Sequence, residues 1–320
     1  MKKIFALVIL ACAFFSVNAQ EAGNQDLKTD SRFLDPFEQV VIEANQVNFN
    51  LNISYAVSAK VDVQAESNLM QFITTEVKGK TLTIGLAKKA KIAPNFPITI
   101  NLAMPVVTKI QYKGDGNISM DGVPAEKMEL ALNGKGSCKI NNLKVNSSLK
   151  LNATDGFKIE FGESLCNSSA DITIADNAAA NFSRLTSPKL KLNYTSAQPS
   201  KFTSLKCESS LSITHNGAGN IEFSGFAGQS INATLSNTGK ISMAGTASDI
   251  TVSTTSAAAF DALNLTAEKA KVTNGGTGDI AVAVSSKLDA TISSNGSIIY
   301  KGFPKISLEN TAKGQLVNKN

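Results

Sequence analysis

The sequence predicts an all-β fold: a parallel β-helix-like solenoid with coils of about twenty residues, preceded by a non-repetitive β segment. Three observations lead to this prediction. A glycine-framed motif recurs, its copies are spaced by about twenty residues, and apolar residues alternate with polar ones inside each copy. The chain shows no ten-residue helical pattern, and its abundant Asn, Ser, Thr and Gly disfavour helix interiors.

The recurring motif is clearest in four segments, GNISMDG (116–122), GNIEFSG (219–225), GKISMAG (239–245) and GSIIYKG (296–302). Its isoleucine serves as a phase marker for the coils. The steps between markers are 18 to 21 residues, apart from one of 43 that holds two coils, with Ala180 or Phe182 as the missing marker. The phase markers are Ile118, Cys138, Ile159, Phe202, Ile221, Ile241, Phe260, Ile280, Ile298 and Leu316.

Period-two alternation within the motif predicts strands with one buried face. Ile118 and Met120 then share the inward face, as do Ile221 and Phe223. Stacked coils would pair each strand with its copy one coil further on and bury ladders of these side chains. We expect the glycines at the corners, where turns require a positive φ. They are not expected to cradle a phosphate, because no helix follows them.

The first nineteen residues predict a secretory signal peptide. Lys2 and Lys3 precede an apolar run from Ile4 to Phe15, and Val17-Asn18-Ala19 offers small residues for cleavage before Gln20. A lipid anchor on Cys12 is a weaker alternative, since the apolar run continues past this cysteine. No other segment is long and apolar enough to span a bilayer. We therefore expect an exported protein of the periplasm, the outer cell surface or the medium.

Three further regions follow the predicted signal peptide. Residues 20–31 are polar and predict a disordered linker. Residues 32–110 predict a non-repetitive β segment that caps the open end of the solenoid, where strands would otherwise lack a partner. Residues 111–320 form the repeat region. Between Gly162 and Phe202 the glycine-framed turns vanish, so the sequence leaves open the coil register there and whether the solenoid is continuous.

At this point the chain resembles the putative auto-transporter adhesin, head GIN domain family of exported bacterial proteins. The resemblance rests on FEQVVIEANQVNFNLN, VDVQAESNLMQFITTEVKGKTLTIGL, ITINLAMPVVTKIQYKGDGNISM and ISSNGSIIYKGFPKISLENTAKGQL, in this order, and covers nearly all of 32–320. It implies a right-handed parallel β-helix-like fold and a role in cell adhesion. It implies no catalytic residues.

Composition excludes several kinds of chemistry. The formal net charge is +5, and removal of Lys2 and Lys3 leaves +3, without the basic cluster that nucleic-acid binding requires. Cys138, Cys166 and Cys207 predict three buried small side chains, with one disulfide plus a free thiol as the alternative. The single histidine, His215, is expected in a repeat turn, and one histidine cannot form a multi-histidine metal site.

The acids show no arrangement that predicts catalysis or metal binding. Hydrolysis of a polysaccharide on a β-helix would need carboxylates in one phase on neighbouring coils. Asp115, Asp155, Asp261 and Asp279 lie at different offsets from their markers, and Asp121 and Asp171 have no partner in phase. We therefore expect no catalytic residues, no metal and no cofactor.

A strong aromatic platform for sugars is also not expected. The chain has no tryptophan, and Tyr300, Phe182, Phe202, Phe223 and Phe260 lie at inward phases. The favoured hypothesis is an exported, non-catalytic protein that binds a cell-surface glycan or protein through a repetitive polar wall. A polysaccharide-processing enzyme and a purely structural envelope scaffold are the alternatives. The ligand-binding residues and the oligomeric state stay open.

Overall fold

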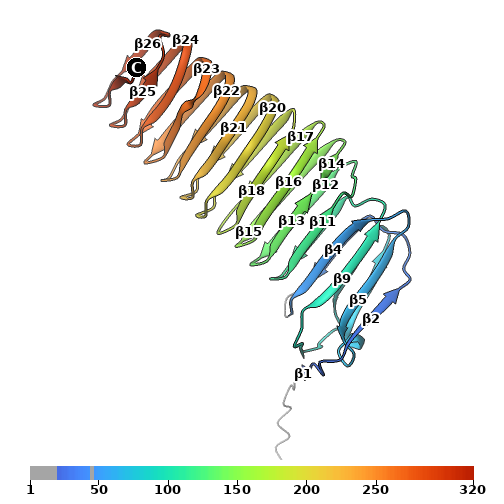
Figure 1. Ribbon diagram of the computed structural model, residues 1–320. Coiled ribbons are helices and arrows are strands. Elements are labelled where there is room, and N and C mark those ends of the chain that lie inside the picture. The colour runs from blue at the N-terminus through green and yellow to red at the C-terminus, as the bar shows by residue number, and fades with distance from the viewer. Residues whose placement is uncertain (1–19, 44–46) are drawn as a thin grey trace, which may run out of the picture.

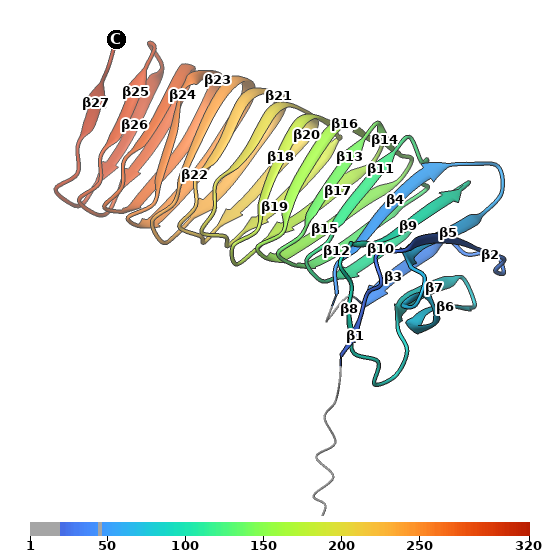
Figure 2. The same ribbon diagram turned by 60° about the horizontal axis from the view of Figure 1, so that its bottom comes forward.

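The computed structural model describes residues 20–43 and 47–320, and the predicted signal peptide lies outside these ranges. The chain forms a long rod in which strands run across the axis and follow one another from the N-terminal end to the C-terminal end (Figure 1). The predicted parallel β-solenoid is confirmed. Figure 2 shows an irregular group of strands at the N-terminal end and regular coils over the remainder of the rod.

Among its described residues, the N-terminal group contains nine strands and one 3-10 turn. These elements are β1 (Glu21–Ala22), β2 (Leu27–Arg32), β3 (Gln39–Glu43), β4 (Phe49–Tyr55), β5 (Lys60–Glu66), η1 (Met70–Phe72), β6 (Ile73–Lys78), β7 (Thr81–Leu86), β8 (Ile92–Ala93) and β9 (Ile98–Met104).

The coils that follow are built from shorter strands first and longer, bent strands later. They are β10 (Lys109–Lys113), β11 (Asn117–Asp121), β12 (Met128–Gly134), β13 (Ser137–Asn141), β14 (Leu143–Val145), β15 (Ser148–Asp155), β16 (Lys158–Cys166), β17 (Ser169–Ile174), β18 (Ala179–Thr186), β19 (Lys189–Tyr194), β20 (Ser200–His215), β21 (Ile221–Leu235), β22 (Lys240–Ser256), β23 (Ala259–Gly276), β24 (Ile280–Ile292), β25 (Ile298–Lys301), β26 (Lys305–Asn310) and β27 (Leu316–Asn318).

The N-terminal group contributes the first coil and then covers it. β3 and β4 pair in parallel with β10 and β11, in the same way that later coils pair with each other. On their other edges β3 and β4 pair with β7 and β9. The antiparallel strands β6, β5 and β2 then complete this end. The parallel edges of the first coil are thus satisfied by strands of the same chain.

The expected disorder of residues 20–31 is wrong. β2 pairs antiparallel with β5 over six residues, from Leu27 opposite Glu66 to Arg32 opposite Val61. The polar sequence misled the prediction because β2 is almost wholly exposed and has no buried side chain. An edge strand is held by backbone hydrogen bonds to its neighbour, and these bonds do not require apolar side chains.

The solenoid is continuous through residues 162–202. Phe161, Phe182, Phe202 and Phe223 stack on successive coils with ring centroids 4.7 to 4.8 Å apart. This spacing equals the distance between neighbouring strands. Strands β15, β17, β19 and β20 stack likewise along the second wall. In this part of the chain the repeat is marked by a ladder of stacked phenylalanine rings and not by glycine-framed turns.

The predicted phase marker Phe202 is wrong, and the correct marker is the preceding inward residue, Ser200. Ser200, not Phe202, lies opposite Ile221, and the missing marker is Ala180. The sequence misled the prediction because Ser200 is polar. Its hydroxyl is buried and accepts a hydrogen bond from the Ala180 amide at 2.9 Å, which removes the cost of burying it.

Glycine occurs at the two ends of the motif for different reasons. The second one turns the chain with a positive φ at Gly122, Gly245 and Gly302, as predicted, but Gly225 does not have a positive φ. The first one does not have a positive φ, which corrects the sequence prediction. A Cβ atom at Gly219 would lie 2.2 Å from the carbonyl oxygen of Gln198, one coil back, and one at Gly116 would lie 2.0 Å from that of Phe49. Close stacking of the corners requires glycine there.

Substitution of Gly219 by alanine tests the corner contact. We expect Gly219→Ala to lower the free energy of unfolding by about 1–3 kcal/mol, because the new methyl group meets backbone rather than a movable side chain. Urea denaturation measures the change. Gly85→Ala is the matched control, since its Cβ would meet no atom closer than 3.6 Å. Equal stability of both variants would contradict the steric explanation.

Candidate functional site

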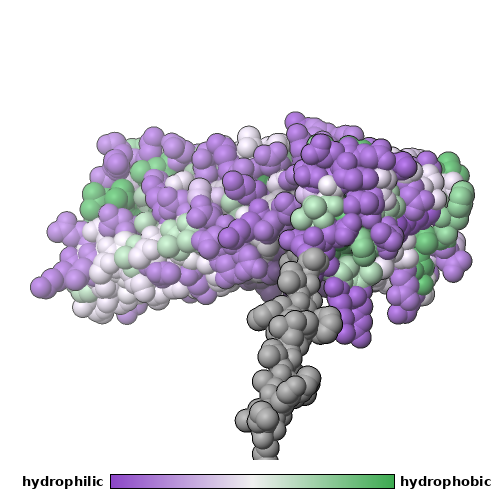
Figure 3. All heavy atoms as spheres, turned by 90° about the horizontal axis from the view of Figure 1, so that it is seen from below, coloured by the Kyte–Doolittle hydropathy of each residue, from purple (hydrophilic) through white to green (hydrophobic). Residues whose placement is uncertain are grey.

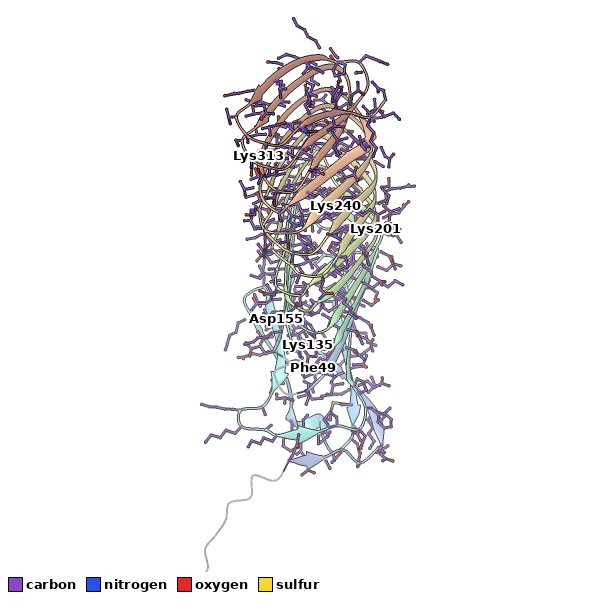
Figure 4. All side chains as sticks on the ribbon, turned by 90° about the vertical axis from the view of Figure 1, so that its left-hand side faces the viewer. Phe49, Lys135, Asp155, Lys201, Lys240 and Lys313 are labelled. Atoms are coloured by element: carbon purple, nitrogen blue, oxygen red, sulfur yellow. The ribbon has the colours of Figure 1, made fainter. Side chains whose placement is uncertain are left out.

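A groove of about 610 Å³ lies on the wall formed by β16, β18, β20, β21 and β22. It is open to solvent and crosses five coils from Lys158 to Lys240. Four strand spacings make this length about 19 Å. In Figure 4 the labelled Lys201 and Lys240 lie close together on the same side of the rod. The lining residues are Lys158, Ile159, Glu160, Ala179, Asn181, Gln198, Pro199, Ser200, Lys201, Asn220, Ile221, Glu222, Lys240 and Ser242.

Two outward columns on either side of the buried markers create the hollow. The residue before the marker is Ala179, Pro199 and then Asn220 in the three middle coils, whereas the lysines at 158 and 240 occupy this position at the two ends. The residue after the marker is Asn181, Lys201 or Glu222. Small side chains thus form the floor, and long charged or amide side chains rise around it.

Ion pairs hold part of the rim. Lys201 Nζ lies 3.0 Å from Glu222 Oε1, and Lys240 Nζ lies 2.9 Å from Asp261 Oδ2. The four side chains are 40% to 53% exposed. Ion pairs this exposed contribute only about 0–1 kcal/mol to stability. A polar ligand can therefore exchange these contacts for its own at small cost.

Acids do lie in phase on this wall, which corrects the sequence analysis. Glu160, Glu222 and Asp261 each follow their marker by one residue. The prediction of no acids in phase was wrong because it considered the aspartates without the two glutamates. Glu222 aligns with Ser242, which aligns with Asp261. Two strand spacings separate their backbones by about 9.5 Å, which is close to the upper limit for the two carboxyl groups of inverting glycosidases.

The electrostatics of this carboxylate pair oppose acid catalysis. Hydrogen bonds from Ser224 and from Lys201 lower the pKa of Glu222. Partial burial opposes ionisation of Asp261, but hydrogen bonds from Lys240 and the Leu263 amide outweigh it and lower its pKa. A general acid in glycoside hydrolysis needs a raised pKa, so that it still carries a proton near neutral pH.

The other aspartates considered in the sequence analysis take part in turns or in hydrogen bonds between coils. Asp115 accepts the Lys135 amide and Asp279 accepts the Ser297 amide, both at 2.8 Å, so each joins one coil to the next. Asp155 occupies a turn with φ 64°. Asp121 accepts a hydrogen bond from the Asn142 side chain.

Asp171 lies on the opposite wall, in a column where charges alternate between coils. Its backbone neighbours are Lys150 on one side and Lys191 on the other. Within residues 20–43 and 47–320, no three His, Cys, Asp or Glu side chains gather in a way that could hold a metal ion.

His215 was expected in a repeat turn, but it lies in a strand just before the turn and its side chain is buried in the core. It ends β20, and its ring lies 5.1 Å from the ring of Tyr194 one coil back. Its Nε2 forms a 2.8 Å hydrogen bond with the carbonyl oxygen of Gly219. Tyr194 binds the Gln198 carbonyl in the same way, four residues on.

The position of His215 recurs on other coils. There too the side chain binds the carbonyl oxygen four residues further on, a contact that we call a corner clamp. Asn274 and Asn310 donate to the carbonyl oxygens four residues after them, each at 2.9 Å. Each of these residues, like His215, precedes its marker by six. This constant offset was the sequence signal for the clamp, and the wrong marker at Phe202 concealed it for Tyr194.

The thiols and aromatic rings offer little exposed chemistry. Cys138, Cys166 and Cys207 are free and buried, as the favoured prediction held, and burial raises the pKa of Cys138 to about 12. The aromatic side chains expected in the core are buried, with Tyr300 partly so. Among the described residues the exposed rings, Phe33, Tyr55, Phe96 and Phe303, lie towards the two ends of the rod and not along its walls.

Comparison with known proteins places this rod in a family. The pattern of the putative auto-transporter adhesin, head GIN domain family matches residues 36–203 and 200–304, and the chain belongs to this family. No protein with a curated description matches the chain. Among its described residues, none of the helical segments is long and apolar enough to cross a membrane.

Several solved structures are similar over most of their length. A putative adhesin from Parabacteroides merdae is 17% identical, with 94% of this chain and 99% of that chain covered and a TM-score of 0.36. A putative adhesin from Parabacteroides distasonis is 16% identical, with 94% and 100% covered and a TM-score of 0.34. A putative lipid binding protein from the same species is 17% identical, with 94% and 100% covered and a TM-score of 0.32.

Replacement of His215 by asparagine tests the clamp and its pH dependence. Burial lowers the pKa of His215 below its unfolded value of 6.5, although its hydrogen bond to the Gly219 carbonyl opposes the shift. The unfolded chain therefore binds the proton first, and stability is lost as the pH falls from above 6.5 towards the lowered pKa, by at most about 1.4 kcal/mol per pH unit.

His215→Asn should remain folded, because asparagine serves as the clamp on two other coils, and should lose this pH dependence. Urea denaturation at pH 7.5 and 5.5 measures the difference for both proteins. Since the chain has one histidine, no other imidazole contributes. An equal decline in wild type and variant would show that His215 is not the source.

Proposed function

We propose that this chain is an exported, non-catalytic protein of the cell surface or periplasm that binds a cell-surface glycan or protein through the groove on the β16–β22 wall. The observation that carries the proposal is the shape of this groove. It extends over five coils, and charged and amide side chains surround a floor of small residues. A groove of this length fits an extended ligand better than a compact one.

The side chains of the groove suit hydroxyl-rich or charged ligands. Lys201 and Lys240 donate hydrogen bonds, Glu222 accepts them, and the amides of Asn181 and Asn220 can do both. The absence of an aromatic ring from this lining favours hydrogen bonding over stacking as the mode of recognition. Each contact is weak, so many copies on one surface would gain strength by avidity.

The ionised state of the carboxylates supports a binding function over a catalytic one. Both Glu222 and Asp261 have lowered pKa values and lysine partners. They can bind cations or hydroxyl groups, but neither is suited to deliver a proton. Export is supported by the signal sequence predicted for residues 1–19 and by the name of the family, which describes adhesins.

The proposal is tested with the chain from Gln20 to Asn320 on an array of polysaccharides and surface proteins, with retained protein and released product both recorded. We expect retention without product. Lys201→Ala should then weaken binding about tenfold, because it removes a central donor of the groove.

Lys206→Ala is the matched control. Both lysines lie on β20 and both form an exposed ion pair with a glutamate, Lys201 with Glu222 and Lys206 with Glu208, but Lys206 does not line the groove. Equal loss or equal retention in the two variants would remove the groove from the binding site. Product release that disappears with Glu222→Gln would overturn the non-catalytic proposal. No retention and no product would favour a scaffold.

A further inference from the structure

The last coil of the rod leaves two edge strands, β26 and β27, each of which pairs on one side only within the described residues. β26 pairs in parallel with β24 on one side, and no strand in the described part of the chain pairs with its other side. The N-terminal end differs, because antiparallel strands cover its first coil. A strand edge with free amide and carbonyl groups is a template for pairing with another strand.

Apolar side chains are exposed beside this edge. Ile306 and Leu308 stack on Leu288 and Ala290, which are buried, so they point towards the core of the solenoid. Yet Ile306 is 38% exposed and Leu308 is 47% exposed, and Phe303 just before β26 is 89% exposed. Figure 3 shows hydrophobic groups at the end of the rod that carries the C-terminus. Apolar patches of this kind indicate an interaction surface.

The sequence of β26 is complementary to itself. We propose that β26 pairs antiparallel with β26 of a second copy of the chain, about a twofold axis at Ser307. Lys305 then lies opposite Glu309 of the other copy, and Ile306 lies opposite Leu308. Residues directly opposite in an antiparallel pair share one face of the sheet. The outward face therefore gains two pairs of opposite charge, and the inward face gains two apolar pairs.

Other registers lose this complementarity. A shift by one residue places Ile306 opposite Glu309 and mixes the two faces. A shift by two residues keeps the faces but places Glu309 opposite Ser307, so both charge pairs are lost. The proposed pairing is symmetric and closed, and it ends with two rods joined at their C-terminal ends instead of a fibre. Strands β7 and β9 already occupy the parallel edges of the first coil, so β26 of another copy cannot extend that coil head to tail.

A cysteine on the proposed axis gives the most direct test. In an antiparallel pair the Cα atoms of opposed residues lie about 4.5–5.5 Å apart, within the range that a disulfide spans. We expect Ser307→Cys, in the chain from Gln20 to Asn320, to form a covalent dimer under mild oxidation on a non-reducing gel. Asp289→Cys is the matched control, since Asp289 precedes Ser307 in the same column but lies on an internal strand. The native cysteines are buried.

Charge exchange separates pairing from misfolding. Lys305→Glu and Glu309→Lys each place like charges opposite one another, and each should weaken self-association about tenfold in sedimentation experiments. A mixture of the two variants restores both opposite-charge pairs and should form a heterodimer. Urea midpoints equal to wild type exclude a folding defect. A monomeric wild type, a dimer that neither variant weakens, or equal cross-linking at 289 and 307 would overturn the proposal.

Discussion

Close stacking of one coil on the next is the constraint on which this structure depends. Neighbouring strands must lie about 4.8 Å apart along the whole rod, and the corners must follow at the same spacing. At Gly219 this spacing brings a carbonyl oxygen of the preceding coil to within 2.2 Å of where a Cβ atom would be. Glycine is thus selected at the corner by the neighbouring backbone, and the twenty-residue period follows because each coil must repeat the path of the one before.

The same stacking arranges the side chains in columns, and the columns determine what the surface can do. Inside, a column can be apolar, as in the phenylalanine ladder, or mixed, as in the column where Tyr194, His215 and Asn274 share their place with Leu235 and Ile292. Outside, two small residues on neighbouring coils, Ala179 and Pro199, lie among longer charged and amide side chains and make the groove. Neither the groove nor the carboxylate pair of Glu222 and Asp261 is local in sequence, since each joins residues from successive coils.

The architecture could be predicted from sequence because alternation is visible within each segment and the period is visible in the spacing between its copies. The exact register could not, because a buried serine with a hydrogen-bond partner looks like an exposed one, and Ser200 was therefore missed as a marker. The sequence also failed to predict that β2 is a folded strand. Its pairing with β5 uses backbone hydrogen bonds, and polar side chains do not indicate such pairing. The column of Glu160, Glu222 and Asp261 could have been read from the sequence, since each follows a correctly predicted marker by one residue. The groove could not, because Ala179 and Pro199 fall beside each other only with the corrected markers Ala180 and Ser200.

Hydrogen exchange followed by mass spectrometry tests the continuous stack most directly. The backbone amides of β16, β18 and β20, between residues 158 and 206, should exchange as slowly as those of β21, β22 and β23, because each of these strands pairs with a neighbouring coil on both sides. Fast exchange confined to residues 162–202 would show an interrupted solenoid. It would also divide the groove and remove the structural basis of the proposed binding wall.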